Sequence, residues 1–349
     1  MIRVLLVDDS ATTRQLMRHI IQSDPELQVI AEASDGQQAV NVTRRDRPDI
    51  VLMDIVMPVM DGLDATQVIM AQTPTPIVLV SGAMQGKETD LAFRAIRQGA
   101  LTLLPKPVGP DDPAFADQAN RLRATLRALA GVRVIHHNSP RPPQSAPAVS
   151  KTVVQGSVAE PPQIVAITAS TGGPAALAEI FQRLPANFAV PVVVVQHIAA
   201  DFLNSLRGWL NQTTPLQFEL AAQGQPLLPG HVYFGPIGRH LCFDARRQVC
   251  FRDTPKLPHT PAGDVLFESV AERFGAAAVG VLLTGMGADG AAGLLAMRQQ
   301  GAVTIAQDQA SCAVFGMPAE AIKLGAARHT LPLHGIARML TEIVQPASD

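Results

Sequence analysis

The sequence predicts an α/β protein made of two doubly wound domains with parallel sheets, joined by a helix and a flexible linker. Short apolar runs alternate with amphipathic segments in both halves of the chain, which is the pattern of βαβ units. The chain has 349 residues, more than a single hydrophobic core usually serves. Residues 139–162 are rich in Pro, Ser and Gln and have the composition of a tether. We expect domains over residues 1–120 and 161–349, with the helix and linker over 121–160.

Composition and charge restrict the classes of function. Hydrophobic residues make up 47% of the chain and charged residues 17%, which is typical of a well-packed folded protein. The net charge of −2 gives no electrostatic reason to expect a nucleic acid or an anionic membrane as partner. No apolar run approaches the roughly 18 residues that span a bilayer, and Met1 leads directly into a predicted strand and not into a signal peptide. We expect a cytoplasmic protein with no nucleic-acid partner and no membrane insertion.

The three cysteines are expected to be buried and chemically inert. They are far apart in sequence and lack metal-ligand spacing, and an odd number does not suit a disulfide framework. They are Cys242, Cys250 and Cys312.

The first half of the chain predicts a parallel sheet whose strands end in polar residues. The expected strands are residues 2–7, 28–31, 50–53, 77–80 and 101–104. Ligands of such sheets bind at the carboxyl ends of the strands. The polar residues at those ends are Asp8, Asp9, Asp54, Ser81 and Lys106.

The chemistry of these five residues indicates phosphoryl transfer onto a carboxylate. Three carboxylates so close would repel one another, and a hard divalent cation with oxygen ligands, above all Mg²⁺, relieves the repulsion. Asp54 can then attack a phosphoryl donor, and Lys106 and Ser81 can hold the phosphate oxygens. Each residue alone is more often a helix cap or a turn former, whereas the five in this order are specific.

These residues resemble the receiver domain of two-component response regulators. The resemblance covers residues 1–108 and lies in Asp8-Asp9-Ser10, Asp54, Met57-Pro58, Met60-Asp61-Gly62, Ser81 and Lys106-Pro107. It implies a flavodoxin-like strand order 2-1-3-4-5 and Asp54 as the phosphoacceptor from a chemosensory histidine kinase. It also implies Mg²⁺ held by Asp9, Asp54 and the Val56 carbonyl, with Asp8 nearby. Leu103 stands where the family often has an aromatic switch residue.

A helix is predicted between the first domain and the linker. Residues 118–130 place Leu122, Leu126 and Leu129 at helical spacing. We expect this apolar stripe to pack on a domain surface.

The second half is organised around Ser170. Residues 164–169 predict a buried strand, and the apolar run after Pro174 predicts the start of a helix. Gly172 and Gly173 in the turn can adopt positive φ angles and allow close approach of another molecule. A serine here lies beside N–H groups at the positive end of a helix dipole, where an oxyanion could be held. By itself, such a serine is more often a small polar residue in a tight turn.

Two further strand ends could complete a catalytic set. Residues 192–195 predict a strand followed by His197, and residues 279–284 predict a strand followed by the loop that contains Asp289. If both strands neighbour the strand before Ser170, one sheet edge gathers the Ser, His and Asp that acyl transfer uses. Taken singly, His197 is as readily a packed histidine and Asp289 a turn residue.

The loop around Asp289 also supports a rival interpretation. Gly285, Gly287 and Gly290 match the spacing of a dinucleotide-binding fingerprint, and Asp308 follows the next predicted strand. The Asp289 carboxylate would repel a pyrophosphate bound there, whereas its charge is favourable beside a histidine. A nicotinamide-dependent enzyme is the alternative on pattern alone.

The second half resembles the chemotaxis protein-glutamate methylesterase family, CheB. The resemblance runs from residue 164 to 343 and lies in residues 169–173, 196–197, 228–230, 264–267, 283–293 and 310–318. It implies Ser170 as nucleophile, His197 as general base and Asp289 as the orienting acid, with the Met286 N–H as an oxyanion donor and no cofactor for the esterase chemistry. It further implies hydrolysis of glutamate methyl esters and deamidation of glutamines on methyl-accepting chemoreceptors, which controls chemosensory adaptation.

A receiver joined to such a domain is that family's arrangement and implies regulation by phosphorylation. We expect the unphosphorylated receiver to cover the Ser170 cleft and phosphorylated Asp54 to open it. Two positions depart from the family pattern: Thr168 replaces a usual Gly, and Thr260 replaces an Arg often found after His259. If these departures silence hydrolysis, the alternative is a non-catalytic adaptor that docks on phosphorylation.

Overall fold

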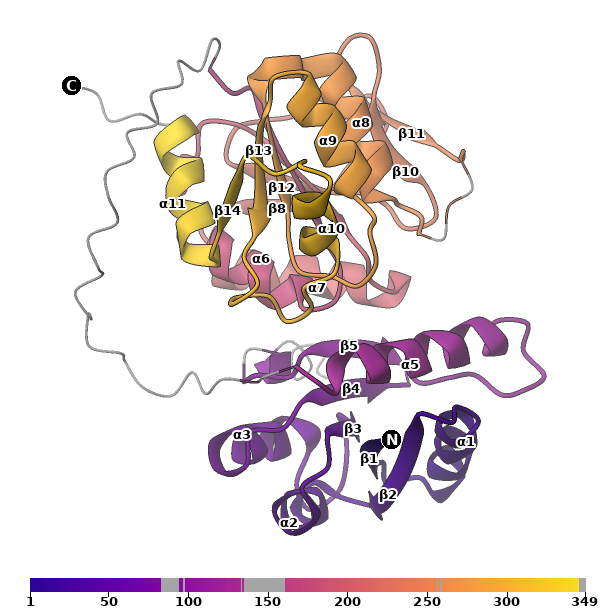
Figure 1. Cartoon of the computed structure of the whole chain (residues 1–349). Coiled ribbons are helices and arrows are strands. Elements are labelled where there is room, and N and C mark those ends of the chain that lie inside the picture. Colours follow the sequence, from indigo (N-terminus) through magenta and orange to yellow (C-terminus); the bar gives the residue numbers. More distant parts are fainter. Residues whose placement is uncertain are drawn as a thin grey trace.

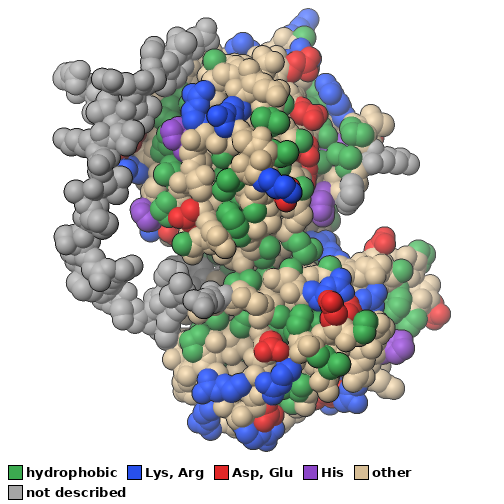
Figure 2. Space-filling model, in the orientation of Figure 1, with side chains coloured by type: hydrophobic (Ala, Val, Ile, Leu, Met, Phe, Trp, Pro, Cys, Tyr) green, Lys and Arg blue, Asp and Glu red, His purple; other side chains and the backbone are tan. Residues whose placement is uncertain are grey.

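The computed structural model describes residues 1–82, 94–96, 98–132, 134, 161–255, 257 and 259–344. The chain forms two lobes, each built on its own sheet (Figure 1). The expected linker, residues 139–162, lies outside the described residues except for residues 161 and 162. Positive and negative side chains are mixed over the visible face of both lobes (Figure 2). None of the helices in the described part of the chain has the length and apolar character that crossing a membrane requires.

The N-terminal lobe contains, within the described residues, a five-stranded parallel sheet in the order β2-β1-β3-β4-β5. Its strands are β1 (Ile2–Val7), β2 (Leu27–Ala33), β3 (Ile50–Asp54), β4 (Ile77–Ser81) and β5 (Thr102–Pro105). Strands β3 and β4 are buried over their whole length, as expected for a parallel sheet covered on both faces. The flavodoxin-like fold and its strand order are confirmed.

Three helices of this lobe begin at capping side chains. They are α1 (Ala11–Gln22), α2 (Gly36–Asp46) and α3 (Gly62–Gln72). Their N-caps, Ser10, Asp35 and Asp61, each accept a hydrogen bond from the backbone N–H three residues on. This bond satisfies a donor that the first turn of a helix leaves free. Ser10 and Asp61 of the receiver-like motifs therefore start α1 and α3.

The helix predicted over residues 118–130 is α5 (Phe115–Leu129). Its residues Leu122, Leu126 and Leu129 are buried in one hydrophobic cluster with Ile20 and Ile21 of α1. The apolar stripe therefore fixes α5 on the N-terminal lobe.

The C-terminal lobe contains, within the described residues, a seven-stranded parallel sheet in the order β14-β13-β12-β6-β7-β9-β8. Its strands are β6 (Ile164–Ala169), β7 (Val192–Gln196), β8 (Gln217–Leu220), β9 (His231–Phe234), β12 (Ala278–Leu282), β13 (Val303–Gln307) and β14 (His329–Leu331). Strand β6 pairs with β12 on one side and with β7 on the other. The strands that precede Ser170, His197 and Asp289 are therefore neighbours, which is the condition that the sequence left open.

Helices cover both faces of this second sheet. One face carries α6 (Gly173–Phe181), α7 (Ala200–Thr213) and α11 (Leu333–Val344), which share a hydrophobic cluster. The other face carries α8 (Gly263–Phe274), α9 (Ala291–Gln299) and α10 (Met317–Lys323), which share a second cluster. This is the doubly wound arrangement that the sequence predicted.

An antiparallel hairpin packs beside α8. It consists of β10 (His240–Phe243) and β11 (Val249–Arg252). The Phe243 N–H donates a hydrogen bond to Ser269 Oγ of α8 at 2.7 Å. The hairpin is absent from the expected elements.

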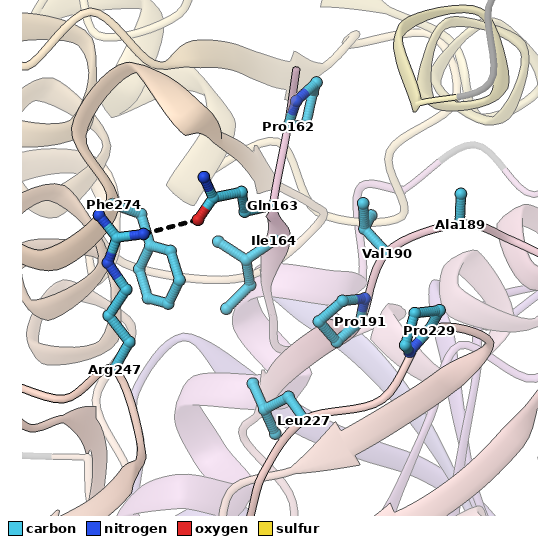
Figure 3. Close-up of a pocket in the computed structure, with 10 residues that line it drawn as sticks. All are labelled: Pro162, Gln163, Ile164, Ala189, Val190, Pro191, Leu227, Pro229, Arg247 and Phe274. Atoms are coloured by element: carbon cyan, nitrogen blue, oxygen red, sulfur yellow. Dashed lines mark hydrogen bonds between the residues drawn. The ribbon is translucent and has the colours of Figure 1, made fainter. Parts of the chain in front are cut away.

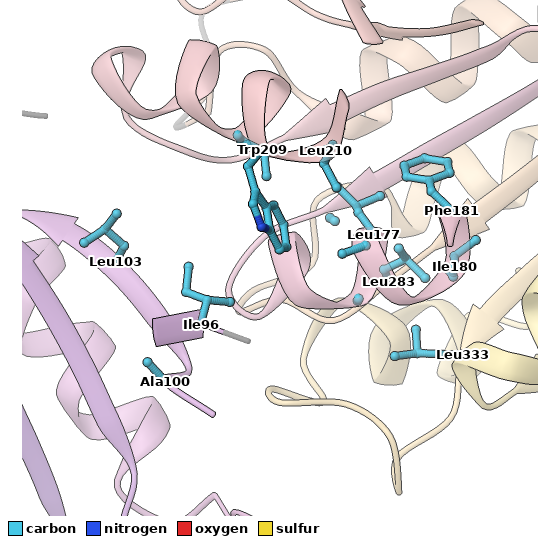
Figure 4. Close-up of a cluster of buried hydrophobic side chains, with 14 of the residues drawn as sticks. Ile96, Ala100, Leu103, Leu177, Ile180, Phe181, Trp209, Leu210, Leu283 and Leu333 are labelled. Atoms are coloured by element: carbon cyan, nitrogen blue, oxygen red, sulfur yellow. The ribbon is translucent and has the colours of Figure 1, made fainter. Parts of the chain in front are cut away.

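A hydrophobic cluster continues from one lobe into the other. Ile96, Ala100 and Leu103 of the N-terminal lobe belong to the same buried cluster as Trp209 of α7. Ile96 points toward the Trp209 ring (Figure 4). Leu103, at the position where the receiver family often has an aromatic residue, is therefore part of a cluster that reaches the C-terminal lobe.

We expect Leu126→Ala to lower the free energy of unfolding by about 2–5 kcal/mol, because it leaves a cavity where a fully buried side chain packs. Urea unfolding followed by circular dichroism measures the change. Asn120→Ala, on the exposed face of the same helix, serves as control and should change the free energy by less than about 0.5 kcal/mol. Equal losses in both variants would contradict the packing of α5.

Candidate active site and phosphorylation site

The polar strand ends of the N-terminal lobe meet at one edge of the sheet. Lys106 Nζ lies 2.8 Å from Asp8 Oδ2 and 2.8 Å from Asp54 Oδ2. One oxygen from each of Asp8, Asp9 and Asp54 lies within 4.8 Å of the others. Ser81 ends β4 and is buried, and its carbonyl accepts a hydrogen bond from the Lys106 N–H at 2.8 Å. The structure therefore brings the five predicted residues to the same edge.

The charges at this edge alter one another's protonation. Burial raises the pKa of Asp54, and this effect, with the negative charge of Asp8, outweighs the hydrogen bonds from Lys106 and the Ile55 N–H. Burial alone would lower the pKa of Lys106. The contacts of the ammonium group with Asp54 and Asp8 outweigh this effect and raise the pKa. Lys106 is therefore a firmly protonated cation between two carboxylates.

The same edge offers the donor set that Mg²⁺ takes. Asp8, Asp9 and Asp54 present hard carboxylate oxygens, and a single lysine only partly balances their repulsion. Val56 lies two residues beyond the end of β3, in the loop before α3, and its side chain is exposed. The residues present therefore fit a divalent cation.

In the C-terminal lobe, Ser170 stands at the turn from β6 to α6. The Ser170 N–H donates to the Thr284 carbonyl at 3.0 Å. The Ser170 carbonyl accepts hydrogen bonds from the Gly173 N–H at 2.8 Å and from Gln196 Nε2 at 2.9 Å. Gln196 Nε2 also donates to the His197 carbonyl at 3.0 Å. The Gln196 side chain therefore clamps the two backbone segments that carry Ser170 and His197.

The glycines of the Ser170 turn are required by the packing of the protein itself. Gly172 has a φ of 79°, and a Cβ there would lie 2.5 Å from the Ala313 Cβ. Gly173 lacks a positive φ, and its Cβ would lie 2.1 Å from Gln196 Oε1. The expectation of positive φ was thus correct for Gly172 alone. The protein's own side chains, and not another molecule, occupy the space beside both glycines.

His197 follows β7 and lies beside Ser170 across the strand pair. Strands β6 and β7 pair Ala169 with Gln196, and the His197 N–H donates to the Ala169 carbonyl at 3.0 Å. His197 Nε2 lies 2.8 Å from Asp289 Oδ2, although the contact does not have the geometry of a hydrogen bond. His197 Nδ1 is buried and makes no hydrogen bond to any described residue. One ring nitrogen therefore faces the carboxylate and the other is available.

The Asp289 carboxylate is fixed by the start of α8. It accepts hydrogen bonds from the Gly263 N–H at 2.6 Å and the Asp264 N–H at 3.0 Å. Such N–H groups at a helix N-terminus favour a negative charge. Burial alone would raise the pKa of Asp289, but the contact with His197 and these two hydrogen bonds together lower it. Asp289 is therefore an anion placed to stabilise a protonated His197.

Family models match both lobes of the chain. A model of the CheB methylesterase matches residues 165–340, and a model of the response regulator receiver domain matches residues 4–113. The chain belongs to the CheB methylesterase family. The structure of the Thermotoga maritima CheB methylesterase catalytic domain is similar to it, with a TM-score of 0.51 and 38% sequence identity over 52% of this chain and 99% of that chain.

Two relatives align with nearly the whole chain. The chain is 42% identical over 342 residues to protein-glutamate methylesterase/protein-glutamine glutaminase 4 of Myxococcus xanthus (strain DK1622), covering 97% of this chain and 96% of the relative. It is 44% identical over 343 residues to protein-glutamate methylesterase/protein-glutamine glutaminase 3 of Anaeromyxobacter dehalogenans (strain 2CP-C), covering 97% and 98%.

The CheB chain accommodates Thr168 beside a glycine of α8. Thr168 is fully buried, and a Cβ on Gly263 would lie 2.3 Å from its Cγ2. The missing side chain of Gly263 therefore makes room for the Thr168 methyl group. The Thr168 hydroxyl oxygen is buried without a hydrogen bond to any described residue, which costs stability.

His259 lies against His197 and was not predicted as a site residue. The two rings stack with centroids 4.2 Å apart and planes 15° apart. Both histidines line a pocket of about 220 Å³ together with Thr260. Burial lowers the pKa of His259, and the neighbouring His197 and Arg121 lower it further. Stacking therefore places a second, neutral imidazole over the first.

Arg121 enters the same pocket from the other lobe. It belongs to α5, yet it lines the pocket with His197 and His259. The residue keeps an exposed surface, but the atoms packed around its guanidinium lower its pKa through burial. The sequence held no signal for this contact, because it depends on how the two lobes dock.

The glycine-rich loop after β12 does not favour a dinucleotide. Gly290 has a φ of 87°, and a Cβ there would lie 2.7 Å from Leu282 Cδ1, so side chains fill the space beside it. The Asp289 carboxylate turns to His197. Met286 lies in this loop with its side chain partly exposed.

A larger cavity, of about 400 Å³, lies at the opposite edge of the sheet (Figure 3). It is lined by Ile164, the first residue of β6, and by Pro191, just before β7. Arg247 Nη1 donates to Gln163 Oε1 at 2.6 Å in its wall. Parallel sheets bind ligands at their carboxyl ends, so the smaller pocket beside His197 is the better candidate for the active site. Of the three predicted catalytic residues, only His197 lines it, and Ser170 and Asp289 do not.

We expect Gln196→Ala to slow ester hydrolysis by roughly 10- to 100-fold, because it frees the backbone of Ser170 and His197 to shift relative to each other. Methanol release from methylated receptor measures the rate. Gln182→Ala, at an exposed glutamine after α6, is the control and should leave the rate unchanged. An unchanged rate in the Gln196 variant would show that the clamp does not position the site.

Proposed function

We propose that the protein hydrolyses glutamate methyl esters and deamidates glutamines on chemoreceptors, with Ser170, His197 and Asp289 as a catalytic triad. The observation that carries the proposal is the 2.8 Å contact between His197 Nε2 and Asp289 Oδ2, one strand from the Ser170 turn. The receiver would occupy residues 1–120 and the methylesterase domain residues 161–349. The relatives named as methylesterase/glutaminase support the same activity.

The two ring nitrogens of His197 would have different roles in the reaction. Ser170 Oγ attacks the carbonyl carbon of the ester or amide, and His197 takes the hydroxyl proton. Because Nε2 faces Asp289, Nδ1 is the nitrogen that accepts this proton. Asp289 then stabilises the imidazolium, and the Met286 N–H donates to the oxyanion. His197 returns the proton to the leaving methanol or ammonia, and an activated water hydrolyses the acyl-enzyme.

The receiver would control this reaction through Asp54. A chemosensory histidine kinase would supply the phosphoryl group, with Mg²⁺ held by Asp8, Asp9, Asp54 and the Val56 carbonyl. The metal, when bound, would offset the charge of the carboxylates and of the phosphoryl group. Lys106 and Ser81 would then bind the phosphate oxygens. Such a protein would act in the cytoplasm during chemosensory adaptation.

The unphosphorylated receiver would restrain the esterase through α5. Arg121 lines the pocket of His197 and His259, so it would narrow the approach of a substrate and place a positive charge near the imidazole that must become a cation. Ile96 and Leu103 share a buried cluster with Trp209. Phosphorylation of Asp54 changes the partner of Lys106, three residues after Leu103, and would weaken this contact between lobes.

Ser170→Ala should abolish methanol release from methylated receptor, because the acyl-enzyme cannot form. Loss of the nucleophile of a triad lowers kcat by about 10⁶-fold. Cys312→Ser is the control, since burial raises the pKa of the Cys312 thiol to about 12 and the nearby Asp308 adds to the rise, so this thiol should not act as nucleophile. Full activity in the Ser170 variant would remove Ser170 from the mechanism.

Arg121→Ala should raise the basal rate of the unphosphorylated full-length protein by about fivefold, the factor that corresponds to a screened charge interaction of about 1 kcal/mol. Methanol release measures it, with and without an acyl phosphate as phosphodonor. Arg123→Ala is the control, because Arg123 lies on the same helix but donates to Ser23 and Asn120 within its own lobe. A basal rate unchanged by Arg121→Ala, or raised equally by both, would contradict the restraint.

A further inference from the structure

The β10–β11 hairpin brings two cysteines into direct contact. Cys242 and Cys250 are register partners on antiparallel strands, and their Sγ atoms lie 2.9 Å apart. The Cys242 thiol also lies 3.2 Å from the Cys250 carbonyl oxygen. Two of the three thiols are therefore neighbours, although eight positions separate them in the chain. The expectation that all three would be buried is correct for Cys242 and wrong for Cys250 and Cys312, which are partly exposed.

The side chains of the two cysteines lie on the same face of the hairpin. The opposite face carries Leu241, Phe243 and Val249, which are buried in the cluster under α8. A contact of 2.9 Å needs a shift of only about 0.9 Å to reach the length of a disulfide bond. The strands are already paired at this position, so the bond requires no rearrangement of the fold.

The two thiols differ in their access to solvent. Cys242 is fully buried, whereas Cys250 is partly exposed. Burial and the adjacent Cys250 raise the pKa of Cys242 to about 12, while the positive charges of Arg239 and Arg252 act in the opposite direction. An oxidant in solution therefore reaches Cys250 before Cys242. The buried Cys242 thiol lies next to Cys250 and can react second.

We propose that Cys242 and Cys250 form an oxidation site that takes hydrogen peroxide and closes reversibly to an intrachain disulfide. This site is separate from the ester hydrolysis proposed above. Cys312 is not part of it, since its neighbours are Asp308 and Thr284.

The chemistry proceeds in two steps. Cys250 Sγ, as thiolate, attacks one peroxide oxygen; a sulfur–oxygen bond forms, the oxygen–oxygen bond breaks, and the leaving hydroxide takes a proton and becomes water. Cys242 Sγ then attacks the Cys250 sulfenic acid. A sulfur–sulfur bond forms, the sulfur–oxygen bond breaks, and the Cys242 proton leaves with the hydroxide as a second water. Two thiols are oxidised and one peroxide is reduced.

Hydrogen bonds connect the strand of Cys242 to the residues that bind the Asp289 carboxylate. His240, two residues before Cys242, binds the Pro255 carbonyl at 2.8 Å through Nε2 and accepts the Ala262 N–H at 3.1 Å through Nδ1. The next N–H, that of Gly263, donates to the Asp289 carboxylate. A bond across the hairpin would restrain the strand that anchors this loop.

The test treats the native full-length protein with a small excess of hydrogen peroxide. We expect the mass to fall by two hydrogen atoms, the free thiols to fall from three to one, and a cross-linked pair of peptides to join Cys242 and Cys250. Dithiothreitol should restore both thiols. Oxygen addition without this cross-link, or a disulfide between two chains, would overturn the proposal.

Variants separate the two steps. In Cys242→Ala, the sulfenic acid on Cys250 has no second thiol, so dimedone should label Cys250. In Cys250→Ala, neither the cross-link nor labelling of Cys242 should appear. Cys312→Ser is the control and should lose two hydrogen atoms like the native protein. Labelling of Cys242 in the Cys250 variant, or loss of the cross-link in the Cys312 variant, would contradict the assignment.

Discussion

The place of one carboxylate, that of Asp289, decides the geometry of the candidate esterase site. Two N–H groups at the start of α8 bind it from one side, and His197 lies 2.8 Å away on the other. Because it is bound from both sides, its pKa is lowered and it stays charged although it is largely buried. The parallel order β12-β6-β7 then brings the Ser170 turn to the same edge. The strand order of the sheet sets how far apart the three residues lie, and the N–H groups at the start of α8 keep Asp289 charged.

Both lobes gather their charged side chains at the carboxyl edge of a parallel sheet, but the central charged group has the opposite sign in each lobe. In the N-terminal lobe a cation, Lys106, lies between Asp8 and Asp54. In the C-terminal lobe an anion lies beside an imidazole. Each charged group is paired because an isolated buried charge is costly. The same architecture could therefore serve both the proposed phosphoacceptor and the ester hydrolase, since function resides in the side chains placed on a fold and not in the fold itself.

The two lobes are coupled by short paths through β5 and α5. Leu103 lies in β5 and belongs to the cluster that contains Trp209, while Lys106 follows the end of the same strand and holds Asp54. α5 packs on α1 through its leucines and extends Arg121 into the pocket of His197. Lys106 is therefore a few residues from a contact between the lobes, and the proposed docking switch would use this short distance.

The sequence by itself indicated the strands of the first sheet, the strands before Ser170, His197 and Asp289, and the set of polar residues at the strand ends. The order of the first sheet was implied by the resemblance to receiver domains, and the short strands β8, β9, β10, β11 and β14 were not predicted. Apolar periodicity and turn residues are local signals, and a parallel sheet must gather its strand ends at one edge. Only the tertiary structure decided that His259 stacks on His197, that Arg121 reaches the same pocket, that Gly263 makes room for Thr168, and that Cys242 meets Cys250. These contacts depend on which distant surfaces pack face to face, and that choice leaves no periodic pattern in the chain.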